Sequence, residues 1–169
     1  MLEGITASYK THNMKRLLLI RHAKATHDHN FTDFERPLKK SGIADAEMMA
    51  TRLKVQAIIP EIIVSSPALR TKTTANIFSE HLSIHKPLTD KAIYDATEDD
   101  LLQIINELPN NHDFIALVGH NPSINQLLFF FTRQIRDVPP CAVALIDFEF
   151  EEWAMLGENT GNLVHYDEA

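Results

Sequence analysis

The sequence is poor in cysteine, because Cys141 is the only one among 169 residues. A single thiol excludes a disulfide framework within the chain and any cysteine-rich zinc site. We expect Cys141 to be a buried free thiol, which fits a reducing compartment. No metal site and no cofactor are predicted, since the only local cluster of metal-ligating side chains, residues 27–29, lies in a segment typical of a loop.

Long apolar runs and an excess of positive charge are also missing. No run is long enough to cross a membrane, and the N-terminal residues lack the apolar core of a signal peptide. The formal net charge is -7, whereas general nucleic-acid binding needs a basic surface that displaces counterions from phosphates. We therefore expect a cytoplasmic protein that binds neither membranes nor nucleic acids.

What remains is the composition of an ordinary globular domain. Hydrophobic residues make up 44% of the chain and charged residues 23%, and this length suits one domain with an adequate core. Residues 1–13 are polar and aperiodic, so we interpret them as an N-terminal extension and residues 14–169 as a single domain. The sequence does not predict an oligomeric state.

Strand and helix patterns alternate along this domain. Four consecutive aliphatic residues at 17–20 predict a central strand that is covered on both faces. Further strands are predicted at 61–65, 87–93, 114–118, 141–148 and 163–166, and helices at 41–56, 67–81, 99–108 and 122–132, with a helical turn within 151–156. Ser41, Ser66 and Asn121 are expected to cap helices, with Pro67 and Pro122 at first helical positions. The alternation predicts an α/β fold, a three-layer α/β/α sandwich with a mainly parallel central sheet.

Charged and imidazole side chains follow three of these strands. Arg21 and His22 end the first strand, Arg70 follows the second in the first turn of a helix, and His120 follows the strand at 114–118. Parallel strands end at one edge of a sheet, where ligands bind. Arg70 opposes the helix dipole there unless an anion compensates it. Two arginines can clamp a phosphoryl group and an imidazole can attack it, so the pattern predicts phosphoryl chemistry.

Three short motifs in this arrangement resemble those of a known protein family. The chain resembles the histidine phosphatase superfamily in three segments. These are LIRHA at 19–23, SSP at 65–67 followed by Arg70 and two threonines at 73–74, and VGHNP at 118–122. Within that superfamily the chain is most similar to the SixA-type phosphohistidine phosphatases, which share RPL at 36–38, SG at 41–42 and the compact length. The resemblance covers residues 15–166 and implies a phosphoglycerate mutase-like fold.

The resemblance assigns roles to four residues. It implies that His22 is the nucleophile that becomes phosphorylated, that Arg21 and Arg70 bind the transferring phosphoryl group, and that His120 holds a phosphoryl oxygen. Lys24, Arg36 and Asn121 are candidates for substrate binding. Lys24 and Arg36 can equally be solvated loop charges, and the other histidines, at 12, 27, 29, 81, 85, 112 and 165, are expected to be surface residues.

The sequence departs from the family pattern in two places. Ala23 stands where glycine usually follows the catalytic histidine, and we expect its methyl group to narrow the pocket. The glutamate that protonates the leaving oxygen in many members has no convincing counterpart among Asp95, Glu98, Asp99 and Asp100. A weak acid position favours phosphohistidine, whose P–N bond breaks more readily than an alkyl ester. The short chain also leaves no room for lid segments, so a protein surface could enter the site.

These observations leave three functions open. The first is a metal-independent phosphatase that hydrolyses phosphohistidine or a phosphomonoester through a phosphohistidine enzyme intermediate. The second uses the same chemistry on a small phosphorylated metabolite. The third is a phosphoprotein-binding module without turnover, which the intact set of His22, Arg21, Arg70 and His120 disfavours. The expected partner is accordingly a phosphorylated protein or a small phosphorylated molecule.

Overall fold

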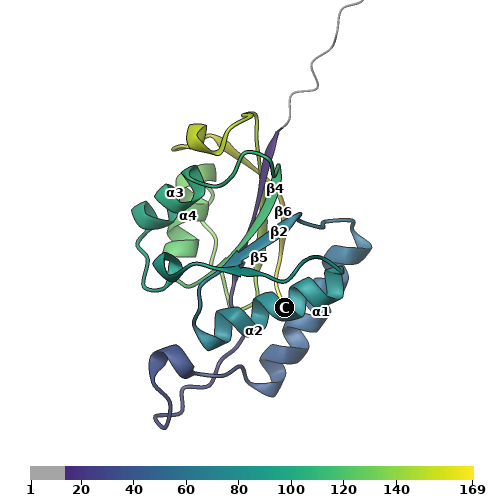
Figure 1. The fold of residues 1–169 in the computed structure, drawn as a ribbon, viewed down its shortest axis with the longest axis vertical. Coiled ribbons are helices and arrows are strands. Elements are labelled where there is room, and N and C mark those ends of the chain that lie inside the picture. Colours follow the sequence, from purple (N-terminus) through teal and green to yellow (C-terminus); the bar gives the residue numbers. More distant parts are fainter. Residues whose placement is uncertain (1–13) are drawn as a thin grey trace, which may run out of the picture.

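The computed structural model describes residues 14–169, so the predicted extension at 1–13 and His12 lie outside the described residues. Six strands form one sheet in the order β3-β2-β4-β1-β5-β6 (Figure 1). The strands are β1 (Lys15–Arg21), β2 (Ile62–Ser65), β3 (Leu88–Thr89), β4 (Phe114–Gly119), β5 (Val143–Phe148) and β6 (Gly161–Asp167). The helices are α1 (Lys40–Val55), α2 (Leu69–Leu82), α3 (Glu98–Asn106) and α4 (Ser123–Thr132), with 3-10 turns η1 (Asp33–Glu35), η2 (Lys91–Ile93) and η3 (Trp153–Met155).

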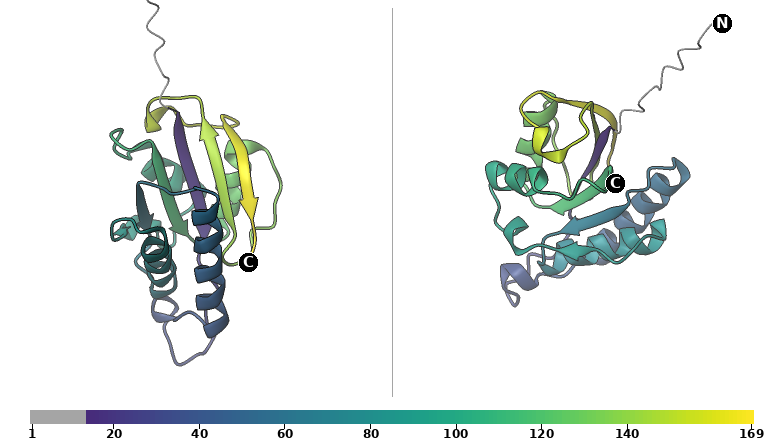
Figure 2. Two further views of the ribbon diagram at one scale, coloured as in Figure 1. Left: turned by 90° about the vertical axis from the view of Figure 1, so that its right-hand side faces the viewer. Right: turned by 45° about the horizontal axis from the view of Figure 1, so that its top comes forward.

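Helices cover both faces of the sheet. On β1, Leu17 and Leu19 pack with α3 and α4, whereas Leu18 and Ile20 pack with α1 and α2. Figures 1 and 2 show the two helix pairs on opposite sides of the strands. Successive strand residues point to opposite faces, so an uninterrupted aliphatic strand needs an apolar cover on each side. The predicted three-layer α/β/α sandwich is confirmed.

The three strands that precede the predicted site residues, β1, β2 and β4, run parallel and end at the same edge of the sheet. β1 and β2 both pair parallel with β4, and Arg21 lies opposite Gly119 while Ser65 lies opposite Val118. Main-chain hydrogen bonds extend this alignment one residue further, from His22 to Gly119 and from Ser66 to Val118. Only β5 and β6 run antiparallel to their neighbours. The residues after β1, β2 and β4 are thus placed side by side.

The predicted helix caps are wrong, although α1 and α4 begin within one residue of their predicted starts. α1, α2 and α4 begin after Lys39, Ala68 and Pro122, and none of these three cap residues makes a side-chain cap hydrogen bond. Ser66 does accept a hydrogen bond from the Ala68 N–H, but it precedes the helix by three residues. Asn121 instead donates to the main chain at residue 138. Side chains that local propensity assigned to helix caps thus make tertiary contacts at the site instead.

The predicted strand at 87–93 is also shorter than expected. Only Leu88–Thr89 pair with β2, and η2 follows directly. The Asp90 carboxylate accepts a hydrogen bond from the Ala92 N–H, which turns the chain out of the sheet.

Cys141 is buried as expected, and burial raises the pKa of its thiol to about 12. Its N–H donates to the main-chain oxygens of both Arg21 and His22, so this residue fixes the end of β1 through its backbone. None of the helices within residues 14–169 is both long enough and apolar enough to cross a membrane.

Candidate active site

A cavity of about 1050 Å³ lies over the ends of β1, β2 and β4. All seven residues that the sequence predicts for the site line it, namely Arg21, His22, Lys24, Arg36, Arg70, His120 and Asn121. The edge of a parallel sheet has therefore gathered side chains that are up to 100 residues apart in the sequence. Their arrangement decides what chemistry the cavity can support.

His22 is held as a neutral imidazole with one free nitrogen. Its Nδ1 lies 2.8 Å from the main-chain oxygen of Ala23, which accepts the Nδ1 hydrogen and leaves the lone pair on Nε2. Nε2 makes no hydrogen bond within residues 14–169. Burial is the largest cause that lowers the pKa of His22 to about 4, and Arg70 and Arg21 act in the same direction. At neutral pH the side chain has the form that a nucleophile needs.

The segment after His22 is fixed by α1 and α2. The Ala23 N–H donates to Thr74 Oγ1 at 3.0 Å, which explains one threonine of the motif at 73–74. A Cβ at Gly42 would collide with the main-chain oxygen of Lys24, so glycine lets α1 approach this segment closely. Ala23 is fully buried and does not line the cavity. The prediction that its methyl group narrows the pocket is wrong, because the methyl group packs into the core between the sheet and these helices.

Arg21 and Asn121 share an acceptor on the far side of the cavity. Arg21 Nη1 and Asn121 Nδ2 donate to the main-chain oxygen of Val138 at 2.9 and 3.0 Å. Arg21 Nε and Asn121 Oδ1 are buried without a partner in the described chain. The shared acceptor orients both side chains, and one buried polar atom of each is left without a hydrogen bond in the described chain.

Arg70 is almost completely buried, at 5% exposure, and its anionic partner is Asp33. Its Nη1 donates to the Asp33 main-chain oxygen, and its Nη2 lies 3.0 Å from Asp33 Oδ2. The anion that the sequence analysis requires at this helix start is thus supplied by the protein itself. Arg70 Nε is buried and has no partner in residues 14–169.

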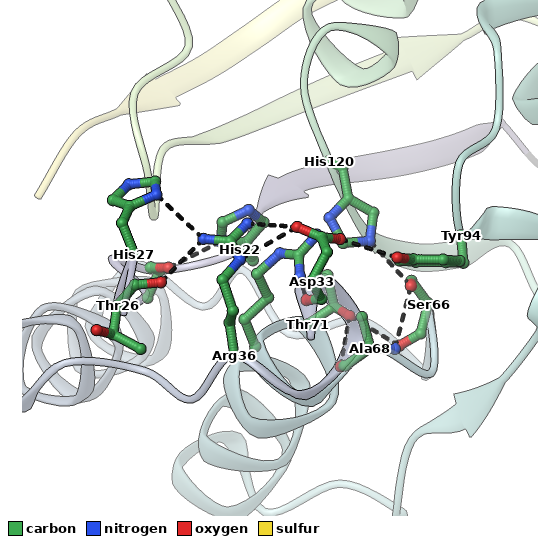
Figure 3. A network of polar contacts seen from close by, with 12 residues as sticks. His22, Thr26, His27, Asp33, Arg36, Ser66, Ala68, Thr71, Tyr94 and His120 are labelled. Carbon is green, nitrogen blue, oxygen red and sulfur yellow. Dashed lines mark hydrogen bonds and ion pairs between the residues drawn. The ribbon is translucent and has the colours of Figure 1, made fainter. Parts of the chain in front are cut away.

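Asp33 is a site residue that the sequence analysis missed. Its carboxylate accepts hydrogen bonds from Arg36, from Arg70 and from the Tyr94 hydroxyl, and Figure 3 shows it between Arg36 and Tyr94. Partial burial acts to raise the pKa of Asp33, but the hydrogen bonds from Tyr94, Arg36 and Arg70 lower it to about 2. The three-residue spacing to Arg36, just before a proline, is the sequence signal that could have identified it.

His120 completes the ring of side chains. Its ring centroid is 5.3 Å from that of His22, and Tyr94 packs edge-on against it at 5.9 Å. Nε2 lies 2.9 Å from Ser66 Oγ, while Nδ1 is buried without a partner in the described residues. Burial, followed by Arg70 and His22, lowers the pKa of His120 to about 3, so this imidazole is also neutral.

The two loop cations differ in their environment. Arg36 donates to Asp33 and to the Thr26 main-chain oxygen, with only 18% of its side chain exposed. Lys24 is half exposed at the cavity rim, where it pairs with Asp45 of α1 at 2.9 Å. Both lie at the site, and the protein satisfies most of the donors of Arg36, whereas Lys24 is paired with Asp45 alone among the described contacts.

The other histidines do not join the site in the same way. His27 lies on the cavity wall near Arg36, and His29 and His85 are exposed. His81, His112 and His165 are partly buried, so they reach the surface with only part of their side chains. His112, for example, pairs with Glu61 at 3.0 Å. Among residues 14–169, no group of three or more histidine, cysteine or acidic side chains is arranged to hold a metal ion. The predicted independence of metal ions stays a prediction.

Three of the four acidic candidates for a proton donor line the cavity. Asp95, Glu98 and Asp99 do so, whereas Asp100 forms a capping box with Thr97 at the start of α3. Burial and the neighbouring Asp99 raise the pKa of Glu98, which favours its protonated form relative to an ordinary glutamate.

The fold and this cavity define a phosphoglycerate mutase-like α/β protein with two histidines and two arginines at the strand ends. Residues 17–97, just under half of the chain, match the model of the histidine phosphatase superfamily (branch 1). The recognition made from the three sequence motifs is confirmed.

Solved structures share the fold over nearly their whole length. SixA from Agrobacterium tumefaciens is 23% identical with a TM-score of 0.80, covering 92% of this chain and 98% of its own. The protein histidine phosphatase SixA complexed with tungstate is 19% identical with a TM-score of 0.71, covering 89% and 95%. A mycobacterial glucosyl-3-phosphoglycerate phosphatase is 14% identical with a TM-score of 0.63, covering 89% and 97%. At these identities the likeness shows the fold alone.

Curated relatives match over shorter stretches. An uncharacterised chloroplastic protein of Arabidopsis thaliana is 42% identical over 74 residues, which are 43% of this chain and 34% of the plant protein. An uncharacterised protein of Mycobacterium tuberculosis is 27% identical over 109 residues, 64% of this chain and 66% of that protein. The chain thus matches less than two thirds of the length of either relative.

Proposed function

We propose that the chain is a phosphatase that hydrolyses phosphohistidine on a protein, with His22 as its nucleophile. One observation carries the proposal. Four buried polar atoms that have no partner within residues 14–169, Arg21 Nε, Arg70 Nε, His120 Nδ1 and Asn121 Oδ1, belong to side chains that line the cavity of His22. Buried polar groups are normally hydrogen-bonded, so such a cluster calls for a ligand. Three of these atoms are nitrogens that can donate, which suits the oxygens of a phosphoryl group.

The proposed reaction has two steps. In the first, His22 Nε2 bonds to phosphorus while the P–N bond of the substrate breaks, and the departing imidazole takes a proton from solvent. In the second, a water oxygen bonds to phosphorus and gives one proton back to solvent, the bond to His22 Nε2 breaks, and phosphate leaves with His22 neutral again. Arg21 and Arg70 neutralise the phosphoryl charge that would repel a nucleophile in both steps.

Two features favour a phosphoramidate on a protein as the substrate. The segments after β2 and β4 are short, residues 66–68 and 120–122, and the longer segment after β1, residues 22–39, holds no helix beyond the three-residue turn η1. A side chain of a folded protein could therefore reach His22. The imidazole of phosphohistidine also departs with less help from an acid than an alkoxide does.

Glu98 favours a second candidate, a phosphatase of small metabolites. Glu98 lines the cavity, and the pKa of its carboxyl group is raised by burial and by Asp99, as a general acid for an alkyl ester requires. The mycobacterial structural neighbour is named for hydrolysis of such an ester. The two candidates differ in whether turnover depends on Glu98.

The test compares substrates under single-turnover and steady-state conditions. The chain should release phosphate from a phosphohistidine peptide and from p-nitrophenyl phosphate, with and without EDTA, and acid quenching should trap an acid-labile phosphoenzyme. Tungstate should inhibit it competitively. Binding of inorganic phosphate without turnover of any substrate would contradict the proposal and favour a binding module. Loss of activity in EDTA would refute the metal-independent mechanism.

A further inference from the structure

Ser66 is the residue behind His120. Its hydroxyl oxygen lies 2.9 Å from His120 Nε2, on the side away from the unpartnered Nδ1. The two residues follow adjacent parallel strands, and the Ser66 N–H donates to the Val118 main-chain oxygen. Their relative position is therefore set by the sheet rather than by a loop. Figure 3 shows the serine and the imidazole facing one another.

The hydrogen-bond partners of Ser66 decide which nitrogen of His120 carries the hydrogen. Ser66 is fully buried, and its oxygen accepts the Ala68 N–H at 3.3 Å. Within residues 14–169, the only acceptor that its hydroxyl hydrogen can reach is His120 Nε2. If Nε2 carried the hydrogen instead, the Ser66 hydroxyl would be left without an acceptor in the core, which is unfavourable. The Ser66 hydroxyl therefore finds an acceptor only when it donates to His120 Nε2.

A neutral imidazole that accepts on one nitrogen carries its hydrogen on the other. His120 then presents Nδ1–H as a donor in the cavity that is also lined by Arg21 and Arg70, whose Nε atoms have no partner within residues 14–169. In the opposite tautomer, Nδ1 would present a lone pair, which repels a phosphoryl oxygen. The Ser66 hydroxyl, directly after β2, thus decides whether the second histidine attracts or repels the ligand.

We propose that Ser66 is a positioning residue that fixes His120 in the Nδ1–H tautomer, so that His120 donates to the phosphoryl group without being charged. This inference rests on the proposed function for the identity of the ligand. Ser66 itself does not touch the ligand. Its role is separate from the helix cap that the sequence predicts, because α2 begins only at Leu69.

The tautomer can be measured directly in the wild-type protein without any ligand. Long-range ¹H–¹⁵N correlation spectra of histidine-labelled protein distinguish a protonated from an unprotonated ring nitrogen, and His120→Asn assigns the signals. We expect protonated Nδ1 and unprotonated Nε2 at pH 7. A protonated Nε2 in the wild type would overturn the inference, whether or not any serine variant folds.

Two matched variants test the role of the hydroxyl. Ser66→Ala should release the tautomer, so that the Nε2–H form becomes populated, and should raise the Kd for inorganic phosphate by about tenfold, as expected for loss of a hydrogen bond to a charged group. Ser65→Ala removes an equally buried neighbouring hydroxyl that donates only to the Ser66 main-chain oxygen. This control should keep both the tautomer and the phosphate Kd.

The outcomes separate this inference from the proposed function. An unchanged tautomer and unchanged phosphate Kd in Ser66→Ala would refute the role of Ser66 even if the protein is an active phosphatase. The expected tautomer and the tenfold weaker phosphate binding, in a wild-type protein that turns over no phosphorylated substrate, would support the role of Ser66 and refute the proposed function.

Discussion

Asp33 and Arg70 form an ion pair inside the cavity, with Arg70 Nη2 3.0 Å from Asp33 Oδ2. The arginine is almost completely buried, whereas 55% of the Asp33 side chain is exposed. A carboxylate of the protein therefore neutralises one of the two arginines that we propose bind the phosphoryl group. Because a phosphoryl group is also an anion, Asp33 and the ligand influence each other electrostatically.

Asp33→Asn tests this influence. Removing the negative charge should lower the Kd for inorganic phosphate about fivefold, which corresponds to ~1 kcal/mol of relieved like-charge repulsion in a partly exposed site. The free energy of unfolding in phosphate-free buffer should fall by about 1 kcal/mol, because Arg70 loses a charged partner. Isothermal titration and urea denaturation measure the two effects.

Glu35→Gln is the matched control for Asp33. Glu35 lies on the same turn, and its carboxylate accepts a hydrogen bond from Thr32. It should change neither quantity beyond the experimental error. Weaker phosphate binding in Asp33→Asn would contradict the prediction and would indicate that Asp33 mainly orients Arg70 for the ligand.

His22→Asn should abolish turnover and phosphoenzyme formation while the protein stays folded. An amide nitrogen cannot attack phosphorus, yet it keeps a polar group of similar size at the end of β1. We expect the variant still to bind inorganic phosphate. His85→Asn, which changes an exposed histidine, should keep full activity. Trapping of a phosphoenzyme in the His22 variant would disprove its assignment as the nucleophile.

The two site histidines should make the protein less stable at acidic pH. Their pKa values in the folded protein, about 4 for His22 and about 3 for His120, lie below the ordinary value of about 6.5 in the unfolded chain. Between these values the unfolded state binds more protons, so the free energy of unfolding falls as the pH is lowered from about 6.5 to 4. Each histidine contributes a slope of up to ~1.4 kcal/mol per pH unit.

Replacing one histidine should remove its share of this slope. In phosphate-free buffer, chemical denaturation of His22→Asn between pH 4.5 and about 6.5 should show a smaller pH dependence than the wild type, by up to ~1.4 kcal/mol per unit. His85→Asn serves again as the control. Equal slopes in the wild type and the His22 variant would mean that His22 titrates in the folded protein as it does in the unfolded chain.

Glu98→Gln and Asp95→Asn decide between the two candidate substrates. If phosphohistidine is the substrate class, both variants should hydrolyse a phosphohistidine peptide at rates close to the wild type, and alkyl phosphates should be poor substrates throughout. A general acid typically contributes ~10²–10⁴-fold. A loss of that size in alkyl phosphate turnover in Glu98→Gln alone would establish Glu98 as the acid and favour a small metabolite.

The sequence was sufficient to predict the fold and to predict which seven candidate residues gather at one edge of the sheet. The aliphatic run before Arg21 and His22 predicted a central strand, because only a strand buried on both faces tolerates such a run. The alternation of strands and helices then implied that Arg70 and His120 reach the same edge. Strand register confirms this, and all seven predicted residues line one cavity.

Only the tertiary structure decided how these residues are partnered. Asp33 and Tyr94 lie 61 residues apart in the chain, and their hydrogen bond depends on how the segment after β1 folds back over the end of the sheet. The local pattern assigned Ser66 and Asn121 to helix caps, yet both bond to groups more than 15 residues away. Local propensity describes a side chain among its sequence neighbours, whereas burial at the sheet edge requires each polar group to find whichever partner the fold brings near it.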